Sequence, residues 1–355
     1  MKKIPILILY SLPSPLFADG SVDNISQPSV LSRLQGVQEA LQSLGHSVQT
    51  LEAGEEITAL IPNILSARTD LVFNLCEEFL GRAQLEMNIA ALLELLDIPF
   101  TGSSALGLGL SQDKGKTNSI LTHQGIQTPA FQICPPGQND FTLRLPLPLI
   151  VKPIREDASL GIDPDALVQD LKAFNLQVQK IHQLYGQPAL VEQFIDGREL
   201  NVSILGNQDL QVLPISEIDF STMPPGLPRI CSYAAKWIES SQEFAHAIPS
   251  CPAVLSPEVE KKVMDAALRA FRVMELRDYA RVDIRLSFDE IPYVLEVNAN
   301  PDISVDAGMT RSAKTAGFSY PEFIQRIVEL AYARRSSWKS RGRARKPPPK
   351  KVSRA

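Results

Sequence analysis

The sequence predicts an α/β domain followed by a larger α+β region. Short apolar strands alternate with amphipathic helices up to about residue 112, which is typical of a parallel sheet covered by helices. From residue 113 onward, strands follow one another more directly, and the segment 280–302 alternates as a hairpin does. A chain of 355 residues is also too long for one compact core.

The first 112 residues contain the alternating elements. A helix over 29–45 is predicted because apolar residues recur at three-and-four spacing and Gly45 ends the pattern. We expect the other elements to be strands at 4–10, 48–51 and 70–75, a helix at 84–97 and a strand at 99–101. This order predicts a three-layer parallel domain over residues 1–112.

The first twenty residues have two interpretations. Two lysines, an apolar run and small residues near Ala18 imitate a secretory signal. Three prolines interrupt the run and an amphipathic helix follows, so we favour a buried strand and a loop. No other segment reaches the roughly eighteen apolar residues of a membrane span.

From Lys114 to residue 333 the pattern is mixed. We expect a helix at 114–124, strands around 131 and at 149–153, 189–195, 200–205 and 210–218, and a helix at 257–274. A further long helix is predicted by apolar residues on one face, namely Leu167, Leu171, Phe174, Val178 and Ile181. This mixture indicates an α+β arrangement.

The hairpin at 280–302 brings two acids together. If its two-residue turn is Asp289-Glu290, Asp283 faces Glu296 across the strand pair, and Arg281 faces Asn298. Facing like charges are destabilising, so this register requires a cation between them.

Two carboxylates and an amide favour Mg²⁺ or Mn²⁺ over zinc, and Mg²⁺ held in this way usually has nucleotide phosphates as its other partners. The alternative is a solvent-exposed hairpin face with a different turn.

Residues suited to phosphate come before the hairpin. Lys152 ends the buried run LPLIVKP, so its ammonium group emerges at a strand end. Ser159 and Gly161 follow on a loop whose hydroxyl and amide groups could wrap phosphates. Alone, this pattern also fits an ordinary surface strand end.

Two acids suit a nucleoside. Glu192 and Glu199 flank a turn, and a carboxylate can accept hydrogen bonds from ribose hydroxyls or the adenine amine. Each also fits an ordinary surface position, and Lys114 and Lys236 are equally ambiguous alone.

Composition narrows the class of protein. The chain is 44% hydrophobic and 21% charged, as in ordinary globular proteins. Its four cysteines lack zinc spacing, which indicates free thiols in a reducing compartment, and we expect a cytoplasmic location. Residues 334–355 carry ten Lys or Arg and no acid, so we expect a disordered tail that is either solvated or bound to nucleic acid, phospholipid or an acidic partner.

A set of short segments follows in order along the chain: Lys114, VKP at 151–153, VEQFIDGRE at 191–199, AAKW at 234–237, ARVD at 280–283 and LEVNANP at 295–301. Together these segments resemble the D-alanine–D-alanine ligase branch of the ATP-grasp enzymes. VFNL at 72–75, ALLELLDIPFTGS at 91–103 and AGFSYPEFIQRIVEL at 316–330 extend the match to roughly residues 70–333. The combination is specific although each piece is short.

The resemblance implies a fold and its divisions. It implies an ATP-grasp domain at 113–333 with two α+β lobes, the small lobe at about 113–195. A Rossmann-like pre-ATP-grasp domain would occupy 1–112, and the basic tail 334–355.

The resemblance also implies residue roles. It assigns phosphates to Lys114, Lys152, Ser159 and Lys236. Adenine would be bound by Glu192 and the following backbone to Ile195, and ribose by Glu199. Two Mg²⁺ or Mn²⁺ ions would be bound by Asp283, Glu296 and Asn298. Catalysis would use Arg281, Lys152 and Ser159, with Arg281 beside the transferring phosphoryl group.

The substrate end departs from the family pattern. The family's early glycine-rich segment has no counterpart, and CEEFLGRAQLE at 76–86 replaces its HGxxGEDG loop. An ungapped comparison puts Asp302 at an oxyanion-hole glycine and Ala307 at a serine for the acceptor's carboxylate. An ammonium group could instead be received by Glu77, Glu78, Asp302 and Asp306.

The resemblance implies an ATP-dependent carboxylate-amine ligase that works through an acyl phosphate. We expect small-molecule substrates, with an amino acid, peptide or other amine as the acceptor. The alternatives are an authentic D-alanine–D-alanine ligase in cell-wall precursor synthesis and a non-catalytic Mg-ATP-binding regulatory protein. A homodimer is expected by analogy alone.

Overall fold

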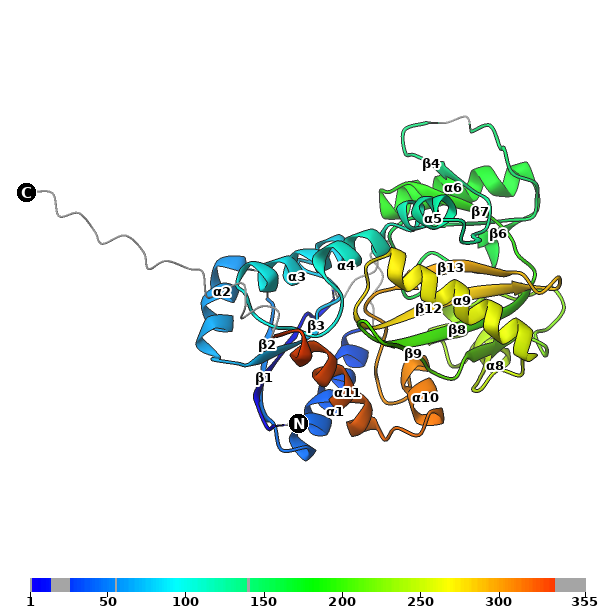
Figure 1. The fold of residues 1–355 in the computed structure, drawn as a ribbon. Helices are drawn as coiled ribbons and strands as arrows, with labels where there is room; N and C mark the ends of the chain where they lie inside the picture. Colours follow the sequence, from blue (N-terminus) through cyan, green and yellow to red (C-terminus); the bar gives the residue numbers. More distant parts are fainter. Residues whose placement is uncertain (1, 14–25, 55, 139–140, 336–355) are drawn as a thin grey trace, which may run out of the picture.

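The computed structural model describes residues 2–13, 26–54, 56–138 and 141–335 (Figure 1). The described residues form three sheets, each with its own covering helices, and the mixed α/β and α+β prediction is confirmed. Part of the predicted N-terminal loop (14–25) and nearly all of the predicted tail (336–355) lie outside the described residues.

The first sheet is parallel, with the strand order β2-β1-β3. Its part of the chain comprises β1 (Pro5–Tyr10), α1 (Ser26–Ser43), β2 (Ser47–Glu52), α2 (Ile57–Ser66), β3 (Leu71–Leu75), the 3₁₀ turn η1 (Ala83–Leu85), α3 (Glu86–Leu95) and α4 (Ala105–Gln112). On β1, Leu7 and Leu9 pack with α2 and α3, whereas Ile6 and Ile8 pack with α1 on the other face. The sheet is therefore the middle of three layers, as predicted.

The last helix of the described chain also covers this first sheet. Phe323, Ile324 and Ile327 of α11 (Tyr320–Ala333) share a core with α1 and with Ile6 and Ile8 of β1. Figure 1 shows α11 beside α1, far from the four-stranded sheet described below. The boundary at residue 112 remains a prediction, because the two ends of the chain fold together here.

Some predicted elements of this part differ in form. Residues 99–101 make one parallel bridge, between Phe100 and Val72, rather than a strand. Helices α2 and α4 were not predicted. Pro62 interrupts the apolar run of α2, and two glycines weaken the helical propensity of α4.

The second sheet is antiparallel, with the strand order β4-β7-β5-β6. Its part comprises α5 (Lys114–His123), β4 (Phe131–Cys134), β5 (Leu149–Pro153), the 3₁₀ turn η2 (Pro164–Ala166), β6 (Leu167–Val168), α6 (Leu171–Tyr185) and β7 (Ala189–Gln193). The prediction that Leu167 lies on the long helix is wrong. Leu167 pairs with Ile150 as a strand residue, because Asp170 caps α6 by accepting a hydrogen bond from the Ala173 N–H.

The third sheet has the order β11-β10-β8-β12-β13, with β9 also paired to β8. Its part comprises β8 (Gly197–Gly206), β9 (Leu210–Val212), β10 (Ser216–Asp219), α7 (Tyr233–Trp237), α8 (Gln242–His246), β11 (Ile248–Ser250), α9 (Pro257–Val273), β12 (Asp278–Ser287), β13 (Pro292–Asn298) and α10 (Gly308–Thr315). The predicted strand 210–218 is two strands, β9 and β10. Pro214 lies between them and has no N–H to donate to a ladder.

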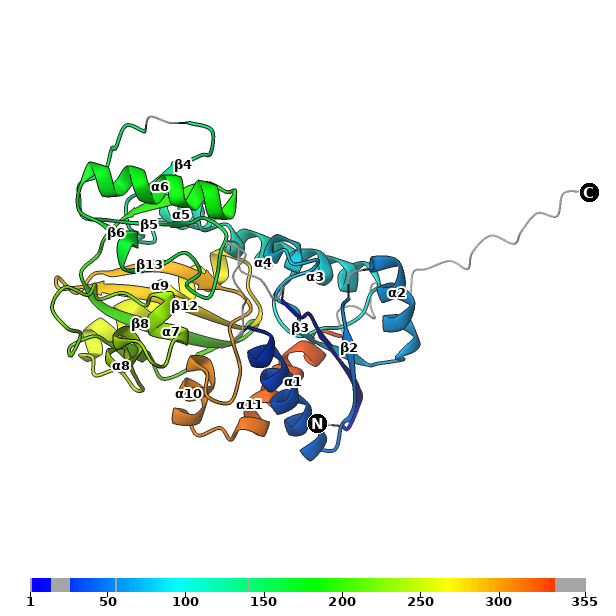
Figure 2. The same cartoon turned by 180° about the vertical axis from the view of Figure 1, so that it is seen from behind.

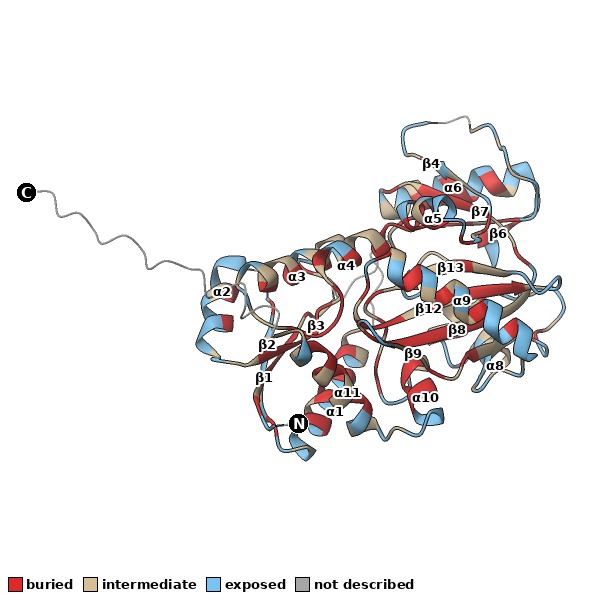
Figure 3. Ribbon diagram, in the orientation of Figure 1, coloured by how far each residue is buried: buried red, intermediate tan, exposed pale blue. Residues whose placement is uncertain are grey.

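One face of the third sheet is apolar and the other is charged. Val282 and Ile284 of β12 share a core with Val263 and Phe271 of α9, which lies across this face in Figure 1. Figure 2 shows the molecule from behind, and Figure 3 shows that the central strands are largely buried. The alternate residues of β12 are therefore left to face a cleft.

Candidate active site

The hairpin of β12 and β13 has the predicted register at the site but not at the turn. Asp283 pairs with Glu296 and Arg281 pairs with Asn298, as predicted. Ile284 pairs with Val294, so Leu295 is an extra residue in a β-bulge. The predicted two-residue turn is wrong: the Ser287 N–H donates to the Ile291 carbonyl around the three residues 288–290, and Glu290 has φ 58°.

The charged face of the third sheet lines a cavity of about 530 Å³, within the range of small-molecule sites. Residues of β5 and β7, on the second sheet, form part of its wall. Every residue predicted for ATP, metal or catalysis except Lys114 lines this cavity, whereas of the acids predicted for an ammonium group Asp302 and Asp306 line it and Glu77 and Glu78 do not. The lining residues of the first group are Lys152, Ser159, Glu192, Ile195, Glu199, Lys236, Arg281, Asp283, Glu296 and Asn298. Folding therefore brings together residues that are up to 146 positions apart.

Two side-chain cations compensate the facing acids. The Arg281 Nε and Nη2 atoms donate to the two Asp283 oxygens at 2.7 and 2.8 Å, and Lys114 Nζ lies 3.0 Å from Glu296 Oε1. The Asn201 amide donates to Asp283 at 2.8 Å. The sequence argument names a metal ion as the compensating charge, whereas in the structure Arg281 and Lys114 compensate the two acids.

Asp157 is a site residue that the sequence reasoning missed. Its carboxylate accepts a hydrogen bond from Lys114 Nζ at 2.8 Å, and Lys114 also donates to the Glu156 carbonyl at 2.6 Å. Burial raises the pKa of Asp157 despite Lys114, whereas Lys114 keeps the pKa of Glu296 low against the effect of burial. The available signal was its position two residues before Ser159, at the start of the loop that was predicted to wrap phosphates.

The donor set at the hairpin fits a divalent cation. Asp283, Glu296 and Asn298 supply oxygen atoms from adjacent strands to one wall of the cavity. This chemistry suits Mg²⁺ or Mn²⁺. A bound cation would compete with Arg281 and Lys114 for the two acids.

Lys152 and Glu192 form a buried pair on the second sheet. Lys152 Nζ lies 2.6 Å from Glu192 Oε2, and the Asn118 amide donates to Glu192 Oε1 at 2.7 Å. The two charged side chains are 9% and 3% exposed. The pair is thus fixed at the junction between the positions predicted for phosphate and for adenine.

The position of Glu199 depends on the close approach of the first residues of β8 to β12. Gly197, two residues earlier, has φ 150°, and a Cβ there would lie 2.0 Å from the Leu286 carbonyl oxygen. Only glycine allows this approach of β8 to β12. Glu199 then pairs across the sheet with Arg285, whose Nη1 donates to Glu199 Oε2 at 2.8 Å.

The loop that carries Ser159 is hydrogen-bonded to residues 231–237, which include α7. Ser159 Oγ donates to the Cys231 carbonyl at 2.8 Å, and Trp237 Nε1 donates to the Ala158 carbonyl at 2.9 Å. Lys236 lies beside this contact, with Nζ 5.1 Å from the centre of the Trp237 ring. These bonds hold Ser159 and Lys236 at the same edge of the cavity.

The substrate end contains a second residue that the sequence reasoning missed, Arg33 of α1. Its guanidinium contacts Glu77 and lies 3.6 Å from Asp302 Oδ1. Two of the four acids that were expected to be available for an ammonium group therefore already have a cationic partner. The sequence feature that could have indicated Arg33 is a charged residue on the apolar face of a predicted helix.

The other acids near this end differ in environment. Asp306 is exposed and lines the cavity. Burial, together with repulsion from Glu77, raises the pKa of Glu78 to about 7. Burial would raise the pKa of Asp302 as well, but Arg33 and Ser304 lower it overall.

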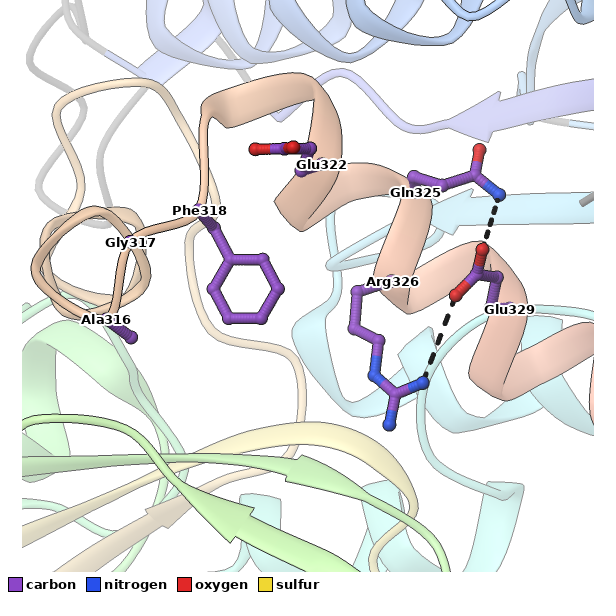
Figure 4. Close-up of a pocket in the computed structure, with 7 residues that line it drawn as sticks. All are labelled: Ala316, Gly317, Phe318, Glu322, Gln325, Arg326 and Glu329. Carbon is purple, nitrogen blue, oxygen red and sulfur yellow. Dashed lines mark hydrogen bonds and ion pairs between the residues drawn. The ribbon is translucent and has the colours of Figure 1, made fainter.

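A smaller cavity, of about 380 Å³, lies at the turn between α10 and α11 (Figure 4). It contains no predicted site residue. Its Glu329 is held by Gln325, which donates at 3.2 Å, and by Arg326 at 3.9 Å. The predicted chemistry therefore belongs to the larger cavity.

Two further expectations can be compared with the described residues. Cys76, Cys134, Cys231 and Cys251 are all free, as predicted. Among the helices of the described chain, none is long and apolar enough to cross a membrane.

The chain is similar to several known proteins. Residues 127–329 match the family described as the D-ala D-ala ligase C-terminus. The chain is 35% identical to the uncharacterized protein y4sG of Sinorhizobium fredii, covering 83% of this chain and 86% of that protein. It is 33% identical to a D-alanine–D-alanine ligase of Bordetella petrii, covering 84% and 86% respectively.

A solved structure has the same fold. The D-alanine–D-alanine ligase from Bacillus anthracis complexed with ATP aligns with a TM-score of 0.73 over 94% of this chain and 99% of that chain, at 22% identity. The family match covers more than half of the chain, and the relative from Bordetella petrii covers more than four fifths of it. The chain belongs to the D-alanine–D-alanine ligase family of ATP-grasp enzymes, which are ATP-dependent ligases.

Proposed function

We propose that the protein joins a carboxylate to an amine with cleavage of ATP, and that the amine is an amino acid, peptide or other amine and not D-alanine alone. The observation that carries the proposal is the single cavity that holds Lys152, Glu192, Glu199, Arg281 and the three oxygen donors of the hairpin. The residues proposed for phosphate, for the nucleoside and for the metal thus line one cavity of suitable size.

The chemistry follows from the poor reactivity of a carboxylate. A carboxylate oxygen attacks the γ-phosphorus of ATP, the bond to the bridging oxygen breaks, and ADP leaves. The amine nitrogen then attacks the acyl carbon of the acyl phosphate, phosphate leaves with the electrons of the C–O bond, and the nitrogen loses a proton. The result is an amide.

The protein's contribution would be mainly positioning and electrostatic stabilisation. Lys152 and Arg281 would lie against the transferring phosphoryl group. The other phosphate oxygens would be contacted by Lys114, Ser159 and Lys236. Glu192 with the backbone to Ile195 would bind adenine, and Glu199 ribose. Asp283, Glu296 and Asn298 would hold Mg²⁺ or Mn²⁺, which supplies positive charge to the phosphates.

The acids of the substrate end support an altered amine. Glu77 and Asp302 are paired with Arg33, which leaves Asp306 and Glu78 as the acids with the fewest internal cations. Ala307 has no hydroxyl that could donate a hydrogen bond to the carboxylate of an acceptor amino acid. That carboxylate would therefore lack a hydrogen-bond donor at this position. These features favour an amino acid, peptide or other amine that is not D-alanine alone.

The test is an assay of phosphate release that depends on ATP, across a panel of amino acids, dipeptides and simple amines. We expect release with at least one pair of substrates. Release with D-alanine as the only substrate would show that the substrate end has been misread, and no release with any member would contradict the ligase proposal.

An authentic D-alanine–D-alanine ligase is the second candidate, because the relative from Bordetella petrii carries that activity in its name. A non-catalytic role is not adopted, since Arg281 and the three oxygen donors are all in place. A homodimer, a cytoplasmic location and an acidic partner for residues 334–355 remain predictions.

A further inference from the structure

Arg285 lines the part of the cavity proposed for ATP, which also contains Lys152, Glu192, Glu199 and Arg281 and is called the nucleotide end below. None of the proposed steps uses Arg285. It follows Arg281 and Asp283 on the cleft face of β12, and it is 3% exposed. Its guanidinium carbon lies 5.6 Å from the centre of the Phe194 ring and 5.7 Å from that of Phe220. A cation buried between two aromatic rings needs hydrogen-bond acceptors for its N–H groups.

The acceptors come from three separate segments. Nε donates to the Ile195 carbonyl at 2.9 Å, Nη1 donates to Glu199 Oε2 at 2.8 Å, and Nη2 donates to the Arg229 carbonyl. Ile195 follows β7 of the second sheet, and Glu199 belongs to β8 of the third. One guanidinium thus fixes the spacing between the backbone proposed for adenine and the carboxylate proposed for ribose.

The contact with Glu199 leaves one of its oxygens available. Only Oε2 is bonded to Arg285, and within the described chain Oε1 has no hydrogen-bond donor. Glu199 lines the cavity, so Oε1 can accept a hydrogen bond from a ligand hydroxyl. Burial raises the pKa of Glu199, and the Arg285 guanidinium offsets part of that rise.

We propose that Arg285 is a positioning residue that orients Glu199 toward the ribose hydroxyls and thereby sets the preference for ATP over deoxy-ATP. This inference rests on the proposed function, because it takes the nucleotide to be bound with its ribose at Glu199. Arg285 acts through Glu199 and the Ile195 carbonyl and does not touch the reacting atoms.

The experiment measures binding, so that it does not depend on the unidentified amine. Calorimetry gives the Kd of the full-length protein for Mg-ATP, Mg-2′-deoxy-ATP and Mg-3′-deoxy-ATP. The variants are R285M, which keeps an unbranched side chain between the two rings but donates no hydrogen bond, R285K, which keeps the charge, and E199A. Since a hydrogen bond to a charged group is lost, we expect R285M to reduce the preference for ATP over one deoxy nucleotide by about tenfold.

The readouts separate positioning from a structural role. R285K should retain part of the preference, and R285M added to E199A should change the preference no further. Should R285M fail to fold, R285K and the double variant R285M/E199A provide the same comparison.

The possible results are distinguishable. A folded R285M that binds every nucleotide more weakly by the same factor would overturn the inference, and so would a wild-type protein that binds ATP and both deoxy nucleotides equally. A wild-type protein that does not bind Mg-ATP would overturn the proposed function together with the inference.

Discussion

The nucleotide end and the substrate end of the cleft are built differently. At the nucleotide end, side chains on β5, β7, β8 and β12 form pairs of opposite charge, such as Lys152 with Glu192 and Arg285 with Glu199. At the substrate end, acids lie on the loops after β3 and β13, and Arg33 from α1 pairs with two of them. Regular strands fix the first set, whereas loops present the second.

The difference teaches where this chain keeps its family's chemistry and where it departs from it. A charged side chain that is already paired on a strand has a fixed orientation. A nucleotide that replaces its partner therefore costs little additional conformational entropy. Loops tolerate substitution and insertion, and they commonly carry specificity. The substrate end is therefore where a new amine would be selected.

The largest effect is expected from breaking a buried pair at the nucleotide end. K152M removes the cation and leaves Glu192, 3% exposed, with only the Asn118 amide. Because an uncompensated buried charge is costly, the free energy of unfolding should fall by about 3–5 kcal/mol. Urea unfolding without nucleotide measures it.

Two controls sharpen this prediction. K172M makes the same change at an exposed position on α6 and should alter stability by less than about 0.5 kcal/mol. K152M/E192M removes both charges and should recover most of the loss. A double variant no more stable than K152M would contradict the view that the pair, rather than the lysine alone, is what the fold requires.

The next effect concerns the oxygen donors of the hairpin. E296Q removes one charge but leaves Lys114 paired with Asp157, so the fold should persist. Turnover should fall by more than about a hundredfold, because even partners outside a metal's first shell cost 10–100-fold when changed. Phosphate release with the active substrate pair measures it, and E258Q on the exposed face of α9 is the matched control.

Retention of full turnover by E296Q, with unchanged dependence on Mg²⁺, would show that Glu296 is not a metal ligand. The nucleotide end would then have to rely on Asp283 and Asn298 alone.

The smallest effect is a pH dependence at the substrate end. Glu78 has a pKa of about 7 in the folded protein, against 4.5 for an ordinary glutamate. Between these values the unfolded chain releases a proton that the folded protein keeps, so the contribution of Glu78 to stability is lost as the pH rises from about 4.5 to about 7. E78Q should remove this dependence, raising Tm relative to wild type by about 2 °C at pH 8 and hardly at all at pH 4.5.

The control for this prediction is E260Q, which makes the same change on the exposed surface of α9. A difference in Tm between E78Q and wild type that is the same at both pH values would show that Glu78 is solvated. An amine that binds at Glu78 should reduce the pH dependence, since an ammonium group stabilises the charged form.

Much of the nucleotide end could be predicted from the sequence because it depends on strand periodicity. The alternation along β12 and β13 places Asp283 and Glu296 each on the polar face of its strand. The turn itself was mispredicted, since the bulge at Leu295 compensates for a longer loop and leaves no trace in the period-two pattern. The predicted strand register was therefore correct at Asp283 and Glu296 but wrong at the turn of the hairpin.

The residues that escaped prediction depend on tertiary contacts. Arg33 reaches Asp302 across 269 positions, and Asp157 reaches Lys114 across 43 positions. Arg285 pairs with Glu199 through the β8–β12 register, which no local pattern reveals. Local propensity also failed for α4, where two glycines lie in a helix that neighbouring elements stabilise.

The most direct test of the central claim follows isotope from the carboxylate to phosphate. Amino acids and peptides labelled with ¹⁸O in the carboxylate are incubated with the protein, Mg-ATP and each amine of the panel, and the released phosphate is analysed by mass spectrometry. An acyl phosphate predicts one ¹⁸O atom transferred to each phosphate released in the active pair. Phosphate released without the label would contradict the account, because ATP would then have been cleaved without activating the carboxylate.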